Sequence, residues 1–239
     1  MSKTLGIVFS NMHDTRLDKI TEHRTMASVP FGGRYRLIDF VLSNLINSGI
    51  QDVGVIAKSN FQSLMDHLGN GKEWDLARKV GGLTLLPPFG THEAVYYRGR
   101  LEALGNALSY IRSSKAELVL MTDCDNITSI DYSDVIRFHK ERGADVTVVY
   151  KREPIVHSNH DDITTLEMDP EGRVTGAYVN PESEEGAVWL NMAVISKKLL
   201  ERIITLPAQT FTVLPTAFCK RETHALKFTD MSFPAMLQI

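Results

Sequence analysis

Hydrophobic residues along this chain follow two periods in turn, which predicts alternating strands and helices. Apolar residues recur at three- and four-residue spacing most clearly over 37–46, where Gly49 is placed to end a helix. Short, unbroken, β-branched runs predict buried strands, and these occupy residues 5–9, 53–57, 118–121 and 146–150. Strands that alternate with helices in this way favour an α/β fold with a parallel, Rossmann-like sheet.

Three further helices are predicted between the later strands. Ser59 is placed to cap a helix that runs through residue 68, and residues 101–111 form another periodic apolar stretch. The segment DYSDVIRFHKERG, residues 131–143, begins at a capping Asp or Ser and ends at Gly143. The expected helices therefore fall between successive expected strands.

The pattern changes after residue 150. Residues 162–180 contain two alternating runs around the turn sequence Asp-Pro-Glu-Gly at 169–172, which predicts a β-hairpin. A strand at 187–196 and a helix from 197 to about 204 follow. No repeat, low-complexity tract or linker divides the chain, so we expect a single domain.

Composition limits the classes of function. The 239 residues are 43% hydrophobic, enough for a substantial core, and 26 basic against 29 acidic residues give a formal net charge of −3. That balance provides no general attraction to nucleic acid or to an anionic membrane, so any anion site has to be local. Two cysteines, Cys124 and Cys219, make no disulfide framework, and the start MSKTLGIVFS is too short for a secretory signal. We therefore expect a cytoplasmic protein.

Candidate chemistry lies where parallel sheets bind ligands, beyond the carboxyl ends of the strands. After the first strand the chain reads FSNMHDTRL, residues 9–17, without the glycines that bring backbone N–H groups to a phosphate in many nucleotide-binding folds. After the third strand come Asp123 and Asp125. A carboxylate there can hold Mg²⁺ against a nucleotide phosphate, and the alternative is that both are ordinary turn residues.

The stretch VPFGGRYRLIDFVLSNLINSGI, residues 29–50, resembles the signature of the ADP-glucose pyrophosphorylases, the glucose-1-phosphate adenylyltransferases of glycogen and starch synthesis. Weaker agreement extends over residues 97–99, 125, 131–132, 172–173 and 191–192. The resemblance implies a Rossmann-like nucleotidyltransferase domain over 1–239, with a mostly parallel central sheet and a β-hairpin subdomain. In that family a left-handed β-helix follows, and we expect it to be absent here. The apolar ending FPAMLQI suggests a domain shortened at its C-terminal end.

The same resemblance interprets the first loop. In the family, the phosphate of glucose 1-phosphate attacks the α-phosphorus of ATP and expels pyrophosphate. Three glycines of the family loop are replaced here by residues with side chains, which obstruct a close-approach loop, whereas a Thr-Arg pair is retained. The resulting nucleotide or phosphate loop is Asn11, Met12, Asp14, Thr15 and Arg16. The resemblance leaves Arg16 and Asp125 as residual catalytic residues, with Asp125 as the single metal ligand and Mg²⁺ as cofactor only if the protein is active.

Positive charge is also lost at two lysine positions of the family. The lysine facing the triphosphate is Met26 here, and the lysine holding the sugar phosphate is Asn180. With Asp14, the site is three charge units less positive, one from each position. A unit charge at about 4 Å is worth roughly 4 kcal/mol at an effective dielectric near 20. The family sequence GTADA reads GRLEA, with Arg100 in place of threonine. The implied sugar-phosphate region comprises Gly99, Glu102, Asn180 and Asn191.

These substitutions are similar to those of the GlgD-type regulatory paralogue in the same family. The resemblance therefore implies a regulatory subunit of glycogen biosynthesis, in a hetero-oligomer with a catalytic glucose-1-phosphate adenylyltransferase subunit. Arg24, Arg34 and Arg36 are candidates to bind a sugar-phosphate or other anionic effector; alternatively, they form a solvated or ion-paired helix start. An active adenylyltransferase of low rate is the alternative function. A nicotinamide dehydrogenase is disfavoured because no GxGxxG follows the first strand.

Overall fold

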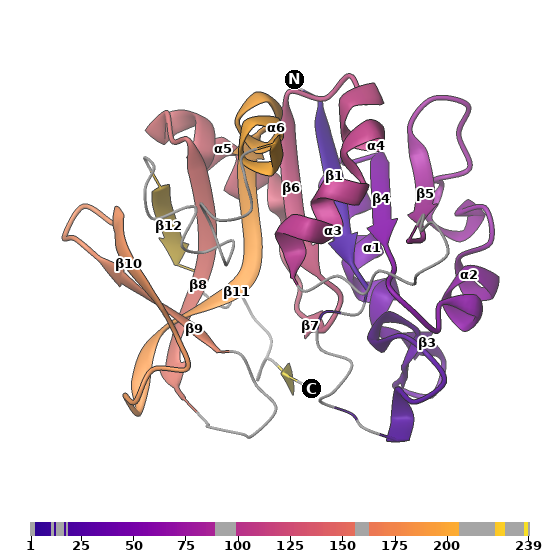
Figure 1. The fold of residues 1–239 in the computed structure, drawn as a ribbon, viewed down its shortest axis with the longest axis horizontal. Helices are drawn as coiled ribbons and strands as arrows, with labels where there is room; N and C mark the ends of the chain where they lie inside the picture. Colours follow the sequence, from indigo (N-terminus) through magenta and orange to yellow (C-terminus); the bar gives the residue numbers. More distant parts are fainter. Residues whose placement is uncertain are drawn as a thin grey trace.

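The computed structural model describes residues 3–10, 12, 17, 19–88, 99–155, 163–205, 223–227 and 237–238. Within these residues nine strands form one sheet, and helices cover both of its faces (Figure 1). The α/β architecture and the β-hairpin subdomain predicted from the sequence are both confirmed.

Four neighbouring parallel strands form one side of the sheet, in the order β6, β1, β4, β5, with β5 at the edge. Their bounds are Leu118–Asp123 for β6, Thr4–Phe9 for β1, Asp52–Ile56 for β4 and Gly82–Leu86 for β5. Phe9 is paired with Ile56 on one side and with Asp123 on the other, so these strands end together. Their shared carboxyl edge is the lower edge of the sheet in Figure 1.

A long antiparallel strand, β11 (Glu185–Ser196), extends the sheet beyond β6. It pairs with β6 near one end, with β8 along most of its length and with β9 near the other end. The register between β11 and β8 shifts between Trp189 and Met192, which marks a β-bulge. The outer strands are β8 (Val146–Pro154), β9 (Thr164–Met168), β10 (Val174–Val179) and β12 (Thr223–Lys227).

Short elements surround the central sheet. Two antiparallel ladders join β2 to β3 and β7 to β13. The bounds of these short elements are Pro30–Phe31 for β2, Tyr35–Arg36 for β3, Asn126–Ile127 for β7, Leu237–Gln238 for β13, Met26–Ser28 for the 3-10 helix η2 and Lys72–Trp74 for the 3-10 helix η3.

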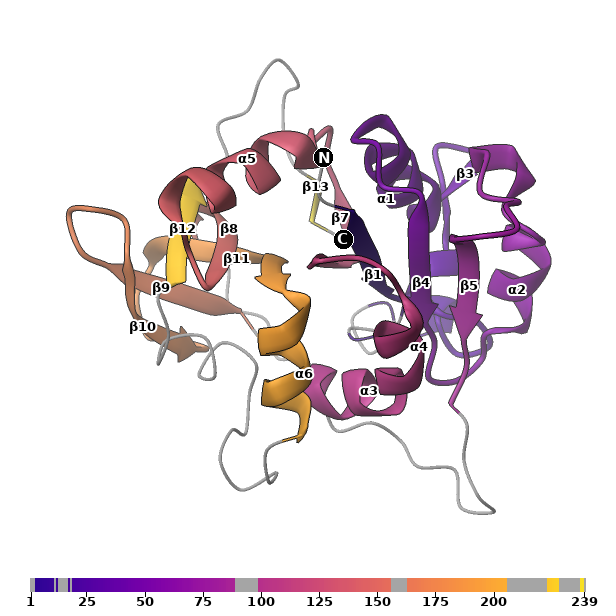
Figure 2. The ribbon, with the colours of Figure 1, turned by 90° about the horizontal axis from the view of Figure 1, so that it is seen from above.

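The helices form two layers, one on each face of the sheet (Figure 2). One face carries α1 and α5, and the other carries α3, α4 and α6. Because successive strand residues point to opposite faces, Ile7 and Met121 pack in the core beneath α3, α4 and α6, whereas Val8 packs beneath α1. The helix bounds are Leu37–Asn47 (α1), Gln62–Leu68 (α2), Arg100–Asn106 (α3), Leu108–Ser113 (α4), Tyr132–Arg142 (α5) and Lys197–Thr205 (α6).

Two predicted helix ends are confirmed and two other details are corrected. Gly49 and Gly143 adopt left-handed φ values of 76° and 58° just beyond α1 and α5. Ser59 does not cap α2, because that helix begins at Gln62 with Phe61 at its cap. The single helix expected over 101–111 is two helices that meet at Ala107, whose ψ of 2° departs from helical geometry.

Two strands of the nine-stranded sheet were not predicted from the sequence. β5 contains the run GLTLL, which alternates weakly, and β12 is a five-residue strand that pairs with β8 from a distant part of the chain. Neither segment has a stronger strand pattern than the residues that flank it. Strand formation there depends on pairing with β4 for β5 and with β8 for β12.

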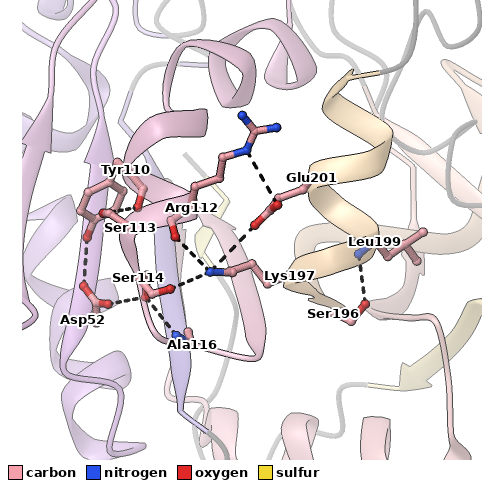
Figure 3. Close-up of polar contacts among 10 residues, drawn as sticks. All are labelled: Asp52, Tyr110, Arg112, Ser113, Ser114, Ala116, Ser196, Lys197, Leu199 and Glu201. Carbon is pink, nitrogen blue, oxygen red and sulfur yellow. Dashed lines mark hydrogen bonds and ion pairs between the residues drawn. The ribbon is translucent and has the colours of Figure 1, made fainter.

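A polar network lies at the amino edge of the sheet, opposite the carboxyl edge (Figure 3). Asp52 accepts hydrogen bonds from the Tyr110 hydroxyl at 3.1 Å and the Ser114 hydroxyl at 2.7 Å. Burial, followed by the charge of Asp52, raises the pKa of Tyr110 above the usual tyrosine range. Lys197 Nζ donates to the carbonyls of Ser114 at 2.6 Å and Arg112 at 3.3 Å, and so caps the end of α4. The network ties α4 and α6 to the central sheet.

Among the helices of the described residues, none combines the length and the apolar character needed to cross a lipid bilayer.

Candidate active site

The candidate site lies where β1 and β6 end side by side. The backbone N–H of Cys124 donates to the Phe9 carbonyl at 3.2 Å, which continues the pairing of the two strands by one step. The buried Cys124 thiol donates to the Ser10 carbonyl at 3.3 Å. This thiol is therefore part of the packing between the two strand ends.

Most of the predicted phosphate loop lies outside the described residues, including Asn11, Asp14, Thr15 and Arg16. Met12 is described, and its half-buried side chain packs against the core beneath α3 and α6. At this position, where the resemblance places a glycine, the side chain contributes to packing.

An ion pair between Arg100 and Asp123 spans the carboxyl edge. Arg100 Nε donates to Asp123 Oδ1 at 3.2 Å, and Nη2 donates to Oδ2, so the contact is bidentate. The Arg100 side chain is 16% exposed and that of Asp123 is 2% exposed. The guanidinium carbon lies 5.9 Å from the ring centroids of both Phe9 and Trp189, within cation–π range. Arg100 stands where the resemblance places a threonine, but nothing in the sequence indicates that Asp123 is its partner.

Asp125 follows two residues later and is also buried, at 6% exposed. Mg²⁺ is usually bound by one or two carboxylates together with phosphate oxygens and water. Asp123 is bound to Arg100, and the described residues contain no cluster of three or more His, Cys, Asp or Glu side chains suited to a metal. Among the described residues, Asp125 is the candidate carboxylate for a metal ion.

Asn191 occupies the bulge in β11 with a left-handed φ of 57°. Two hydrogen bonds fix this bulge: Trp189 Nε1 donates to the Met192 carbonyl at 3.0 Å, and Asn126 Nδ2 donates to the Leu190 carbonyl at 2.7 Å. Since Asn126 directly follows Asp125, the bulge is held beside the metal-ligand candidate. A bulge commonly redirects a side chain near a binding site.

The other residues of the implied sugar-phosphate region lie in two places. Gly99 caps the start of α3 in an extended conformation, and an added Cβ there would meet no atom within 4 Å. Glu102 is exposed on the first turn of the same helix. Asn180, in contrast, lies at the base of the β9–β10 hairpin with φ of 50°. Gly99 and Glu102 thus flank Arg100, whereas Asn180 belongs to the hairpin.

Met26 is enclosed in the protein. It lies in η2 and is 1% exposed within the hydrophobic core beneath α1. At the position where the resemblance places a lysine facing the triphosphate, this chain has an apolar core side chain.

The three effector candidates differ in their surroundings. Arg34 is exposed in the β2–β3 turn. It directly follows Gly32 and Gly33 in that turn, whose φ values are 62° and 78°. Arg24 is partly exposed. Arg36 Nη1 donates to the Ser63 carbonyl at 2.6 Å and hydroxyl at 3.0 Å, which links the start of α1 to α2. Arg36 therefore has a structural role whether or not it also contacts an effector.

The pair Asp131-Tyr132, part of the resemblance, is structural in this fold. Asp131 caps α5 by accepting from the Ser133 N–H at 2.8 Å, and hydrogen bonding from Ser133 holds the pKa of Asp131 below its usual range. Tyr132 is fully buried, and burial raises the pKa of Tyr132 to about 12. Its backbone N–H donates to the Ser48 hydroxyl at 2.8 Å, which joins α5 to the end of α1.

Comparison with known proteins shows which family this chain belongs to. Residues 6–194 match the family described as Nucleotidyl transferase. The glucose-1-phosphate adenylyltransferase of Thermotoga maritima is 35% identical over 206 residues, which are 85% of this chain and 48% of that protein. The proteins of the same name from Pseudothermotoga lettingae and Clostridium novyi are 39% and 33% identical, over 71% and 82% of this chain and 40% and 53% of their own length.

This chain therefore spans about half the length of the curated relatives that it matches. The family match begins within β1 and ends within β11, so it includes the central parallel strands and both carboxylates of the candidate site. The chain belongs to the nucleotidyl transferase family, and its curated relatives agree with its resemblance to glucose-1-phosphate adenylyltransferases.

Proposed function

We propose that this chain is a regulatory subunit of the glucose-1-phosphate adenylyltransferase group, with an eroded active site, acting in the cytoplasm in glycogen biosynthesis. It would modulate a catalytic subunit that makes ADP-glucose from ATP and glucose 1-phosphate. The observation that carries the proposal is the burial of Met26, 1% exposed in the core beneath α1. An enclosed methionine cannot neutralise a polyphosphate.

Two further features support an eroded site. Asn180 is neutral at the second lysine position, and its side chain bonds the backbone of the β9–β10 hairpin. Arg100, a cation that this chain adds near the strand ends, is bound by Asp123. Transfer of a nucleotidyl group depends mainly on positioning and on stabilising charge at the phosphates, so loss of free positive charge weakens it most.

The residual chemistry is assigned to few residues. In an active protein Mg²⁺ would neutralise phosphate charge, with Asp125 as its ligand, and Arg16 would act in the phosphate loop as the resemblance implies. Asn191 and Gly99 would lie beside the sugar phosphate. Positive charge at Arg24, Arg34 and Arg36 would serve an anionic effector such as a sugar phosphate.

The first test measures catalysis by the chain alone. With ATP, glucose 1-phosphate and Mg²⁺, we expect little or no pyrophosphate release. A turnover number in the ordinary range of roughly 1–10³ s⁻¹ would contradict the proposal.

The second test measures partnership. The full-length protein is mixed with a catalytic adenylyltransferase subunit from the same source, and co-elution, the catalytic rate and the effector response are recorded. We expect a complex and a changed rate, because regulation requires that this subunit bind one state of its partner more tightly than another. Absence of both a complex and a kinetic change removes support for the regulatory function.

A second candidate function is an active adenylyltransferase of low rate. It is favoured by Asp125, which keeps a buried carboxylate just beyond the end of β6. On this alternative the chain alone releases pyrophosphate slowly, and Asp125→Asn abolishes that release. A slow rate that survives Asp125→Asn belongs to a contaminating enzyme instead.

A further inference from the structure

We propose that Asn70 and Gly71 form a site of spontaneous covalent modification, at which the Asn70 side-chain amide is lost through a cyclic imide and replaced by a carboxylate. The co-reactant is water, and the reacting groups belong to the turn that follows α2. The inference goes beyond the proposed function and does not depend on it.

The sequence and the turn geometry both point to this pair. Asn70 is exposed, and it is the only asparagine of the sequence that is followed by glycine. Because glycine has no side chain, its backbone nitrogen can closely approach the side chain of the preceding residue. The fold also requires glycine here, since Gly71 has a left-handed φ of 77° and a Cβ there would lie 2.9 Å from the Cβ atoms of Leu76 and Leu83. The turn therefore imposes the reactive dipeptide.

One hydrogen bond activates the Asn70 amide toward attack. Asn70 Oδ1 accepts from the Lys72 backbone N–H at 3.1 Å, which forms an Asx turn. Negative charge develops on this oxygen when a nucleophile adds to Asn70 Cγ, so the Lys72 N–H stabilises that state as an oxyanion-hole donor does. The nucleophile is the Gly71 backbone nitrogen, which belongs to the same turn, so the attack is intramolecular.

The reaction balances with water alone. Hydroxide removes the Gly71 N–H proton, the nitrogen forms a bond to Asn70 Cγ, and the Cγ–Nδ2 bond breaks as ammonia leaves with a proton from water. Water then opens the imide at either carbonyl carbon, which gives aspartate or isoaspartate. The net change is hydrolysis of an amide, without oxidation or reduction. Because the Gly71 N–H donates to the Leu68 carbonyl at 2.9 Å, the attack requires local opening at the end of α2.

The modification would alter the contacts of η3. The Gly71 carbonyl accepts from the backbone N–H groups of Trp74 at 3.1 Å and Leu76 at 2.9 Å. Isoaspartate lengthens the main chain by a methylene just before Gly71 and so displaces this carbonyl. Both products also place a negative charge beyond the carboxyl end of α2, where the helix dipole disfavours it. The Trp74 ring meets the His67 ring edge to face, with centroids 5.7 Å apart, so Trp74 fluorescence reports the change.

The test is incubation of the chain at pH 7 and pH 9, followed by peptide mapping that quantifies conversion at each asparagine. We expect Asn70 to convert at least tenfold faster than Asn47, an exposed asparagine that precedes Ser48 at the end of α1. Conversion should be faster at pH 9, because base removes the Gly71 proton. Asn70→Gln keeps an amide but has to close a larger ring, and its conversion should be at least tenfold slower.

Three results would overturn the site: conversion of Asn70 less than tenfold faster than that of Asn47, conversion independent of pH, or equal conversion in Asn70→Gln. If Asn70→Gln does not fold, as judged by its thermal transition, Asn70→Ser keeps a side-chain oxygen without an amide and should show no conversion. Fluorescence gives a second readout, because emission should change in the converted wild type but not in incubated Trp74→Phe. Unchanged emission in the converted wild type contradicts the displacement of η3.

Discussion

Asn180 and Ile163 are joined by two hydrogen bonds at the base of the β9–β10 hairpin. The Asn180 backbone N–H donates to the Ile163 carbonyl at 2.7 Å, and the Ile163 N–H donates to Asn180 Oδ1 at 3.0 Å. Asn180 makes these contacts with a left-handed φ of 50°, a conformation that asparagine tolerates better than most residues. At the position where the resemblance places a lysine, Asn180 thus has a structural role in this chain.

Asn180→Lys is therefore expected to destabilise the fold. The substitution removes the side-chain acceptor of the Ile163 N–H and places a long side chain at positive φ, which together cost about 1–2 kcal/mol in the free energy of unfolding. Denaturant unfolding of the wild type and the variant measures this difference. Asn180→Gly is the control, because it loses the same acceptor but accepts positive φ, and it should cost less than Asn180→Lys. Equal stability of Asn180→Lys and wild type contradicts this structural role.

Met26→Lys should not restore catalysis. Its side chain would enter the core beneath α1, where an ammonium has to be buried or η2 has to move, at a cost of about 3 kcal/mol or more. Met26→Leu keeps the volume and the apolar character and should cost less than about 1.5 kcal/mol. Thermal unfolding and pyrophosphate release are measured on both variants. A Met26→Lys protein of wild-type stability with increased pyrophosphate release would show that this side chain reaches the active site.

Arg34 and Arg36 should respond differently to truncation. Arg36→Ala removes two hydrogen bonds to Ser63 and should lower the free energy of unfolding by about 1–2 kcal/mol. Arg34→Ala removes an exposed side chain and should change stability by less than about 0.5 kcal/mol. If Arg34 binds an anionic effector, only effector affinity falls in Arg34→Ala, as titration with a sugar phosphate would detect. Wild-type stability of Arg36→Ala would contradict the link between α1 and α2.

His139 should make the protein less stable in mild acid. It is buried on α5 with Nδ1 at 3.0 Å from the Thr147 hydroxyl, and burial lowers the pKa of His139 below the usual histidine value. Because the folded pKa is the lower one, the unfolded chain takes up the proton first as the pH falls. The stability that neutral His139 contributes to the fold is fully present above about pH 6.5. It is lost as the pH falls from there through the folded pKa, by at most about 1.4 kcal/mol per pH unit. Urea unfolding at pH 7.5 and 5.5 should show a smaller decrease in His139→Gln than in wild type, and equal decreases would exclude this effect.

The sequence by itself determined most of the secondary structure and the family resemblance. Alternation of short β-branched runs with amphipathic stretches is a local property, so it predicted β1, β4, β6 and the helix α1 without knowledge of their partners. Turn chemistry is local as well, since the Asp-Pro-Glu-Gly segment formed the predicted hairpin and the glycines after α1 and α5 adopted left-handed φ. The same sequence left β5 and β12 unrecognised, because strand formation there depends on pairing with residues elsewhere in the chain.

The tertiary structure alone decided what the substituted site residues do. Arg100 and Asp123 are 23 residues apart, and they meet because the start of α3 lies beside the end of β6. Asn180 and Ile163 are 17 residues apart and meet because β9 and β10 pair. Met26 follows no periodic pattern in its short 3-10 turn, so its burial depends on the helix that covers it. Charge and burial at a site are properties of the groups that surround it in space, and only the folded chain brings those groups together.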